Sequence, residues 1–453
     1  MVATARRVGE AGAELGPRGL PVVGALRELA RDALGFVSDT ARVYGDVVPF
    51  SVGRAQAWLV SHPDDLEDLL VRQRDHLMKD VITAELSSVL GQGLLTNEGA
   101  SWKRQRRIIA PSFTPRHLAA YGDAMVQSTL EALPPVSADR DVHADFTRMT
   151  LHIVLRTLFG SEPGGEAARV GDVLEGLMAS FEVENRTVWR LVPDWVPGAH
   201  RRRVDTLREE LDTLIFGLVA RARREGTDGR VDLLARLLAA RDDDGHAMSD
   251  EQLRDELLTL FLAGHETTAL ALSYTLWLLA EHPEVLAQVH DELDEVLAGA
   301  LPVAGDTRRL PVLMSVVKES LRLYPPAWAM GRQASAPVQV GEQVIPAGDQ
   351  ITVAPWVVHR DPRWWVGPSR FRPARWRNGE TADLPRFAYF PFGGGERVCV
   401  GQHFAMMEIV LVLATLLQKR SVRAVPGYQP ELFPVVTLRV KNGVRVGLTE
   451  VSR

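Results

Sequence analysis

The 453-residue sequence predicts a mainly α-helical protein with small β-sheets, an α+β fold. Helical periodicity dominates from His62 onward. One helical pattern continues from Ser249 to Glu281, which at about 33 residues is roughly 50 Å long, enough to cross a whole domain. Strand-like runs with turn signals are short and fall near 45–61, 331–354 and 435–448. The β-rich part is therefore expected to be small.

The N-terminal region is expected to begin with a flexible lead over residues 1–15. A helix is predicted from Arg27 to Tyr44. Gly45–Gly53 and Ala57–Ser61 then indicate a hairpin of two strands. The next helix is expected over Asp64–Gln73.

A basic helix is predicted near residues 101–110, and it carries Trp102 and Arg106 four positions apart on one face. Such a pair can hold a carboxylate against a flat apolar ligand. The alternative is a basic helix on the surface, with no ligand. Further helical patterns follow, and a segment rich in Trp and Pro, 189–197, separates the third from the fourth: Arg116–Glu131, Phe146–Leu158, Val170–Arg186 and Val204–Arg224.

The longest helix is predicted to begin at Ser249, where Ser249 and Gln252 form a capping box. Its flanks are apolar, but its centre reads Ala263-Gly-His-Glu-Thr-Thr268, and polar groups inside a buried helix need a partner or a function. A membrane span is disfavoured because no second span and no basic flank accompany it. A zinc protease is excluded, because the H-E-x-x-H pattern fails after His265 and Glu266.

A further helix is expected from Leu310 to Leu323, with Glu319 and Arg322 on one face. A long irregular stretch, His359–Pro391, follows three short strands, and structureless loops of that length are uncommon unless they are functional. Near the C-terminus, the Lys441–Gly443 turn predicts a hairpin between Val435–Val440 and Val444–Leu448. The three short strands are Val338–Val340, Gln343–Ile345 and Gln350–Ala354.

The only cysteine, Cys399, lies in a glycine-rich loop, Phe392–Gly401, directly before an apolar helical segment, Gln402–Gln418. A thiolate binds metal and pushes electron density onto haem iron, so we interpret Cys399 as a haem ligand. The dipole of the following helix favours the thiolate. A buried free cysteine is the alternative, and a nucleotide loop is disfavoured because neither phosphate-binding motif is present. Four glycines are expected to give the loop its backbone freedom: Gly393, Gly394, Gly395 and Gly401.

Composition narrows the class of protein. A net charge of −6 gives no electrostatic reason to expect nucleic-acid binding. One cysteine excludes an intramolecular disulfide and any site that needs several thiolates. No export or membrane segment is recognisable at the N-terminus, so we expect a cytoplasmic protein without a membrane anchor.

Four signatures stand in one order: Trp102-x-x-x-Arg106, Ala263–Thr268, Glu319-x-x-Arg322 and the loop from Phe392 to Gly401. Together they resemble the cytochrome P-450 haem-thiolate monooxygenases of the soluble bacterial type, and the match extends from about residue 16 to the end. The resemblance implies a single haem domain over 16–453, shaped like a triangular prism. It also implies a haem b between the long central helix and the helix after the cysteine loop.

The resemblance implies a role for each matching residue. Cys399 would be the iron ligand, and Phe392 would pack beside its sulfur. Glu319, Arg322 and Arg375 would form a buried ion network under the haem. The sequence departs from the usual Pro-Glu-Arg-Phe pattern there, so no second carboxylate is expected near Arg375. The haem propionates would be held by Trp102, Arg106, Arg332 and Arg397.

On the opposite face of the haem, Gly264 would leave room for dioxygen against the helix, beside Ala263. A threonine hydroxyl there can open the local helical ladder. Thr267 would hydrogen-bond dioxygen or a water, and Glu266 would relay protons from solvent. His265 is either structural or part of the pocket.

The resemblance also suggests the substrate pocket, whose walls are mostly apolar, so a lipophilic substrate is expected: a fatty acid, terpenoid, macrolide or drug-like compound. Electrons would come from a separate ferredoxin or flavodoxin with its NAD(P)H reductase, and the protein is expected to be a monomer. A peroxygenase or isomerase is the alternative within the family, and a non-catalytic binding or membrane protein is the alternative outside it. The expected walls are 77–95, 178–195, Ala263, Thr267, 327–330 and 433–436; the expected docking residues, or else simple surface charges, are Lys103, Arg104, Arg107 and Arg377.

Overall fold

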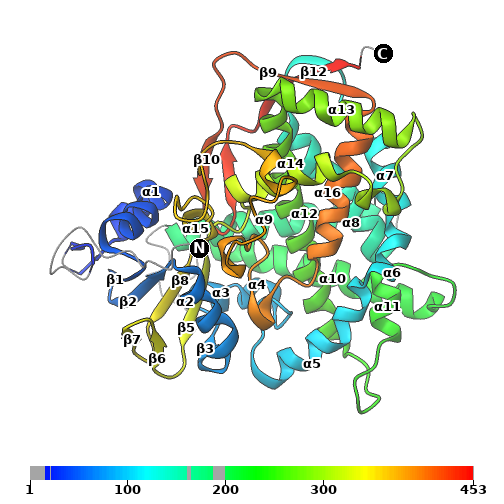
Figure 1. Cartoon of the computed structure of the whole chain (residues 1–453). Coiled ribbons are helices and arrows are strands. Elements are labelled where there is room, and N and C mark those ends of the chain that lie inside the picture. Colours follow the sequence, from blue (N-terminus) through cyan, green and yellow to red (C-terminus); the bar gives the residue numbers. More distant parts are fainter. Residues whose placement is uncertain (1–15, 21, 161–164, 187–198, 452–453) are drawn as a thin grey trace.

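The computed structural model describes residues 16–20, 22–160, 165–186 and 199–451 (Figure 1). The lead predicted over 1–15 and the segment 189–197 lie outside the described residues. The described chain is mainly helical with four small sheets, so the predicted α+β class is confirmed.

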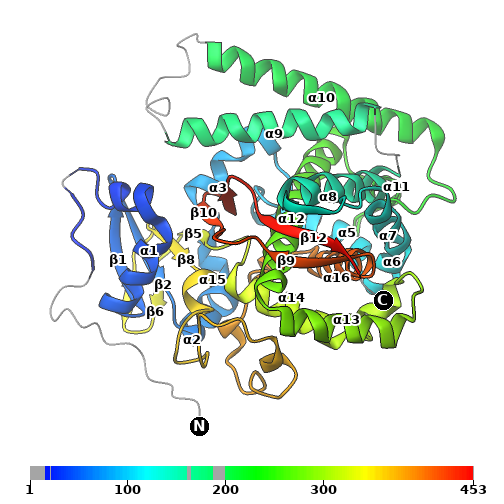
Figure 2. The same cartoon turned by 90° about the horizontal axis from the view of Figure 1, so that it is seen from above.

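A five-stranded sheet gathers segments that are far apart in the sequence. Its strand order is β1-β2-β8-β5-β3, and β2 pairs with β8 in parallel whereas the other pairs are antiparallel. The two predicted β-regions near 45–61 and 331–354 therefore share one sheet, against which α1 packs (Figure 2). The elements are α1 (Leu26–Tyr44), β1 (Val47–Val52), β2 (Ala55–Val60), α2 (Pro63–Glu67), β3 (Leu77–Met78), α3 (Val81–Glu85), α4 (Ser87–Leu90), β5 (Met330–Ala334), β6 (Val338–Val340), β7 (Gln343–Ile345) and β8 (Gln350–Val353).

The helical part is built around α12 (Asp250–Glu281), which packs against α8 along much of its length and also against α14, α16 and α10. Ser249 caps α12 by accepting a hydrogen bond from the N–H of Gln252, 3.1 Å away. Helices α9 and α10 form an outer pair beside α8 (Figure 2). The remaining helices are α5 (Gly99–Ile109), α6 (Pro115–Leu118), α7 (Gly122–Glu131), α8 (Val142–Phe159), α9 (Gly165–Arg186), α10 (Ala199–Glu225), α11 (Leu233–Ala239), α13 (Pro283–Leu297), α14 (Pro311–Leu323), α15 (Pro355–Val358) and α16 (Gln402–Leu417).

The predicted C-terminal hairpin is wrong. The turn at Asn442 and Gly443 exists, with φ of 62° and 75°, but its flanking strands belong to different sheets. Strand β11 (Leu438–Lys441) pairs with β10 (Glu431–Pro434), whereas β12 (Arg445–Glu450) lies between β4 (Ser137–Asp141) and β9 (Arg420–Ala424). The Asp141 carboxylate accepts the N–H of Val444 and fixes the chain on the second sheet. The turn signal was local, but these partners are distant in sequence.

Candidate functional site

The cysteine loop is closed by its own backbone. The N–H of Cys399 donates to the carbonyl of Phe392 at 2.9 Å, and Gly401 follows as the N-cap of α16. The partly buried Phe392 side chain packs against the main hydrophobic core, which includes residues of α12, α14 and α16. The predicted loop before a buried helix is therefore present.

The four glycines of the loop have different physical reasons. Gly393 and Gly395 have φ of 73° and 67°, where a side chain would be strained. Gly394 has extended backbone, but a Cβ there would lie 2.1 Å from the Phe387 ring. Gly401 has a φ of −87°, so its backbone conformation does not require glycine. Its N–H instead hydrogen-bonds the cysteine sulfur.

The Cys399 thiol faces an internal space. It is accessible to a water-sized sphere, although protein atoms surround it on nearly all sides. Burial raises the pKa of the thiol above its usual range, and the Gly401 N–H and the Arg106 charge only partly oppose that rise. A thiolate here thus needs a further positive centre, as an iron would provide.

Three arginines, Arg106, Arg332 and Arg397, lie near one another, and Arg106 lies near the Cys399 sulfur. Trp102 is buried, and the Arg397 guanidinium lies 3.6 Å from the centre of its ring. Arg397 also donates to the Asn97 carbonyl and pairs with Glu98. Arg106 is half-buried and near enough to Cys399 for their charges to interact, and burial lowers the pKa of the guanidinium.

Arg332, on β5, and Lys79, just after β3, extend this group. Burial lowers the pKa of Arg332. Burial, together with the charges of Arg332 and Arg397, lowers the pKa of Lys79 to about 7. Sequence reasoning missed Lys79, since its only signal was a lysine in a predicted pocket wall. Neither Arg106 nor Arg332 has a carboxylate within 4.0 Å among the described residues. Asp80, Glu98 and Glu396 act on Arg332 at longer range, so the four cations face three carboxylates and the cluster keeps a net positive charge.

The predicted buried ion network is assembled. Glu319, Arg322 and Arg375 are at most 1% exposed. Glu319 Oε1 accepts from Arg322 Nη2 at 2.8 Å and from Arg375 Nε at 3.0 Å, while Oε2 accepts from Trp376 Nε1 at 2.9 Å. The expectation of no second carboxylate near Arg375 is wrong, because Glu380 lies 3.9 Å from its Nη1. The carboxylate comes from further along the chain than the usual pattern places it.

This network also holds the irregular stretch 359–391. Arg322 donates to the carbonyls of His359, Pro368 and Arg370 at 2.7–3.0 Å. His359, fully buried, accepts the N–H of Phe390 at 2.9 Å through Nε2. Burial holds the pKa of His359 well below its usual range, so it remains a neutral acceptor. The stretch that leads into the cysteine loop is thus fixed by side chains rather than by a backbone ladder.

The centre of α12 is open although its two flanks are buried. Ala263 is exposed and Gly264 to Thr267 are half-buried, which marks a second wall facing an internal space. Thr267 Oγ1 donates to the Ala263 carbonyl at 2.6 Å. The helix is continuous, so the expected opening of its backbone hydrogen-bond ladder is not seen. The Ala263 carbonyl instead accepts the Thr267 hydroxyl in addition to its helical N–H. A Cβ on Gly264 would lie 3.3 Å from Val154, so that position is tightly packed on its α8 side.

Next to this opening, Glu266 is held by another element. Its Oε1 accepts from Thr437 Oγ1 at 2.7 Å and from Arg439 Nε at 2.5 Å. Burial alone would raise the pKa of Glu266, but Arg439, Thr437 and His265 together outweigh it and lower the pKa, with Arg439 the largest of the three. Sequence reasoning did not find these partners, which lie more than 170 positions away. The ring of His265 lies 5.9 Å from the buried ring of Phe261, which favours a structural part for it.

The predicted pocket walls are only partly described. Residues 187–195 lie outside the described residues. Ala327–Met330 and Phe433–Val435 are half-buried, and the Trp328 indole donates to the Val435 carbonyl at 2.9 Å. Val81 and Ile82, on α3, are apolar and exposed. The described walls remain mostly apolar.

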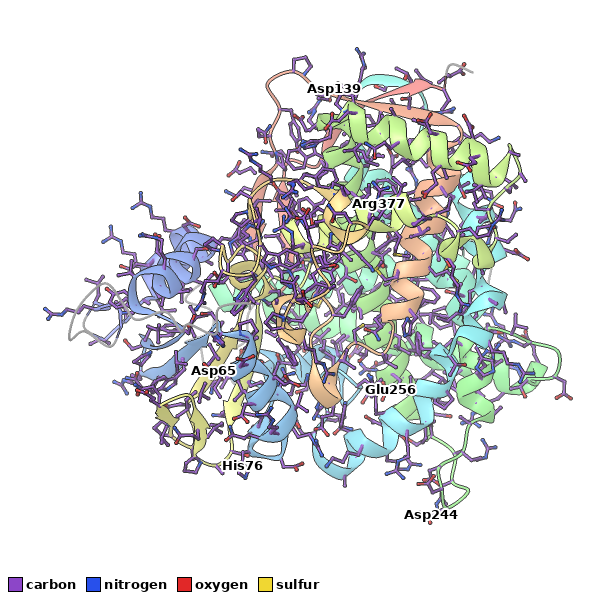
Figure 3. All side chains as sticks on the ribbon, viewed as in Figure 1. Asp65, His76, Asp139, Asp244, Glu256 and Arg377 are labelled. Carbon is purple, nitrogen blue, oxygen red and sulfur yellow. The ribbon has the colours of Figure 1, made fainter. Side chains whose placement is uncertain are left out.

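The four predicted docking residues do not form one patch. Arg104 pairs with Asp242 at 2.6 Å, Arg107 pairs with Asp243, and Lys103 lies 3.7 Å from Asp75. Asp244, at the tip of the same acidic loop, lies below α5 (Figure 3). Arg377 donates to Gln288 on α13 and lies far from α5 in the same view (Figure 3).

These features fit a haem. Haem is a flat, dianionic group that can take one thiolate ligand. The surrounded Cys399 thiol fits the ligand, and the cation cluster fits the two negative charges. The open notch in α12, a helix that packs against α16, fits the flat ring. In the part of the chain that the structure describes, no helix is long and apolar enough for a membrane span.

Comparison with known proteins agrees with this geometry. A family profile described as cytochrome P-450 matches residues 15–442. The chain is 32% identical to cyclooctatin synthase of Streptomyces melanosporofaciens, over 93% of this chain and 92% of that one. It is also 32% identical to pentalenene oxygenase of Streptomyces avermitilis, over 96% of each. The crystal structure of a cytochrome P-450 heme domain superposes with a TM-score of 0.85 at 25% identity, over 98% of this chain and 99% of that one.

Proposed function

This chain belongs to the cytochrome P-450 family and is a haem b monooxygenase, and on that premise we propose that it hydroxylates a lipophilic terpenoid. The haem, with its thiolate ligand, activates dioxygen and supplies the oxidant that inserts one oxygen atom into a C–H bond. The observation that carries the proposal is the open α12 notch among mostly apolar walls, in a chain about one-third identical to relatives that oxygenate terpenoids.

The residues of this chain would divide the work as follows. Cys399 is the ligand, and Arg106, Arg332, Arg397, Lys79 and Trp102 hold the propionates. The Thr267 hydroxyl, which donates to the Ala263 carbonyl in this structure, would turn to donate to dioxygen or a water in the notch, and Glu266 would pass protons inward from solvent. Glu319, Arg322 and Arg375 keep the cysteine loop in place. Residues 16–453 would act as one haem domain.

Two electrons would arrive from a separate ferredoxin or flavodoxin that an NAD(P)H reductase reduces. Of the predicted docking residues, Lys103 and Arg107 both border a groove beside Trp102 and Arg106, and Arg107 is the better placed because its side chain is 66% exposed against 52% for Lys103. Its exposed ion pair with Asp243 can exchange for a partner's carboxylate at little cost.

The test is a spectral screen of the purified protein. Pentalenene, other cyclic terpenes, dodecanoic acid and a macrolide are titrated, and ligand that displaces water from the iron shifts the Soret band. We expect shifts with the terpenes, and a hydroxylated product when ferredoxin, reductase and NAD(P)H are added. Shifts with dodecanoic acid alone would replace the terpenoid proposal with a fatty-acid one. Product formation with peroxide but not with redox partners would indicate a peroxygenase instead.

A further inference from the structure

Glu266 is joined to a hairpin that borders the same notch. Thr437, in the turn, and Arg439, on β11, are two positions apart, so both side chains lie on one face of the hairpin and reach the same oxygen of Glu266. The Glu266 side chain is 16% exposed and that of Arg439 is 30% exposed. The backbone of this hairpin is also attached to α12, since the Tyr274 hydroxyl donates to the Leu438 carbonyl at 2.8 Å.

The opposite strand of this hairpin carries apolar residues after Glu431. Phe433 on β10 is the cross-strand partner of Arg439, so the two side chains lie on the same face as neighbours. The turn between the strands carries Val435 and Val436, and Val436 is 40% exposed. An apolar molecule in the notch can therefore contact Phe433 and the turn, which directly position Arg439 and Thr437.

We propose that the β10–β11 hairpin senses the substrate and controls proton delivery: Thr437 and Arg439 hold the Glu266 carboxylate against the hairpin, and an apolar occupant that displaces these two side chains, while the backbone stays attached to α12, releases it. This inference rests on the proposed lipophilic substrate and adds the device that links its binding to the proton relay. Thr437 and Arg439 are positioning residues, because they act through Glu266.

The chemistry of the carboxylate supports this coupling. A carboxylate that is bound to a guanidinium and a hydroxyl stays ionised and turned toward them, so it is a poor carrier for a proton moving inward. The groups that face Glu266 are Arg439 and Thr437 from the hairpin, His265 from its own helix, and His143 from α8. Both histidines have a lowered pKa because of burial and are neutral near pH 7. Arg439 is thus the charge that decides the state of Glu266.

Linkage gives a measurable consequence. If an occupant can bind only after the Glu266–Arg439 pair breaks, the free energy of that pair is subtracted from the binding free energy. A variant without the pair should therefore bind the occupant more tightly by the corresponding factor. We expect Arg439→Gln and Glu266→Gln each to tighten the binding of pentalenene about 5-fold or more, and the double variant to add nothing further. Arg439→Lys keeps the charge and should restore the wild-type affinity. The matched control is Arg445→Gln, which breaks an exposed ion pair with Asp139 on another sheet.

The second readout follows the proton. In the reconstituted system, the solvent deuterium isotope effect on NAD(P)H oxidation should fall when pentalenene binds to the wild type. In Arg439→Gln it should already be low without pentalenene. Unchanged affinities across the 266–439 cycle, or an isotope effect in Arg439→Gln that still responds to pentalenene, would overturn the inference while leaving the monooxygenase intact. No spectral shift with either pentalenene or dodecanoic acid, in protein with an intact thiolate spectrum, would overturn the lipophilic substrate and the inference with it.

Discussion

The cysteine side and the notch side of this protein are built differently. On the cysteine side, Glu319, Arg322 and Arg375 are buried and bonded to one another or to backbone carbonyls, and Arg397 pairs with Glu98. Around Ala263–Thr267, the walls are mostly apolar, and one carboxylate, Glu266, is held by a hairpin. The first arrangement fixes a geometry that every substrate shares, and the second leaves room for a particular one. The kind of reaction can therefore be inferred from the cysteine side, whereas the identity of the substrate depends on the other.

The largest effect on the cysteine side is expected from Cys399→Ser, which removes the proposed haem ligand. Because the chain has no second thiol, no other residue can supply a thiolate ligand. We expect complete loss of the strongly red-shifted Soret band of the reduced, carbonyl-bound protein, and loss of hydroxylation. Retention of that band in the variant would refute the assignment of the ligand.

The next largest effect is expected from Glu319→Gln, which removes the charge that Arg322 and Arg375 share. Loss of one partner from a buried ion network typically costs about 3–5 kcal/mol, because the remaining charges stay buried without compensation. We expect the free energy of unfolding in urea to fall by that order and haem retention to fall with it. The matched control is Glu380→Gln, whose side chain is 32% exposed and 3.9 Å from Arg375. An equal loss in the control would show that Glu319 has no special position.

This difference between the two sides also explains what could be predicted from sequence. Cys399, Trp102, Glu319 and Arg322 lie at fixed spacings within single helices or loops, so a linear pattern contains their geometry. Glu380 and Arg439 reach their partners through tertiary folding, and no spacing encodes them.

The fold follows the same rule. The long helix from Ser249 was predicted nearly to its ends because its cap and its periodicity are local. The prediction of a C-terminal hairpin was wrong because β11 and β12 pair with strands of two different sheets. Helix α13 was not predicted, although Pro283 at its first position is a known start signal.

Lys79→Met tests the contribution of one buried cation at the edge of the proposed haem site. Folded without haem, Lys79 has a pKa of about 7 against 10.5 for the free side chain, so the unfolded state binds more protons between these values. Lys79 should therefore add a rise in the stability of the haem-free protein with pH from about 7 to 10.5, and Lys79→Met should remove that contribution. Urea unfolding of both proteins across this range measures the difference in slope. Equal slopes in the wild type and in Lys79→Met would show that Lys79 does not titrate there.

The same variant tests whether the haem propionates bind beside the cation cluster. Propionates beside Lys79 would favour its charged form and take up a proton at pH 8, whereas the Cys399 thiol would release one on becoming the thiolate ligand. Calorimetric titrations in two buffers of different ionisation enthalpy measure the net proton exchange, and Lys79→Met should release more protons on haem binding than the wild type. Equal proton exchange in both proteins would place the propionates away from Lys79.

The smallest effect concerns the outer surface of the cysteine side, and Arg107→Glu isolates it. Arg104 is less suitable, because its bonds to Asp242 and Gln252 hold the loop before α12. If a ferredoxin or flavodoxin with acidic residues docks on α5, Arg107→Glu should slow reduction by that partner several-fold at low ionic strength. Salt screens charges over roughly 10 Å at 0.1 M and over less at higher concentrations, so the difference from wild type should shrink as salt is added. Arg377→Glu makes the same change of charge far from α5 and should leave the rate unchanged (Figure 3). A slower rate in Arg377→Glu with none in Arg107→Glu would move the docking face to the α13 side, because electrostatic steering acts where the opposite charges meet.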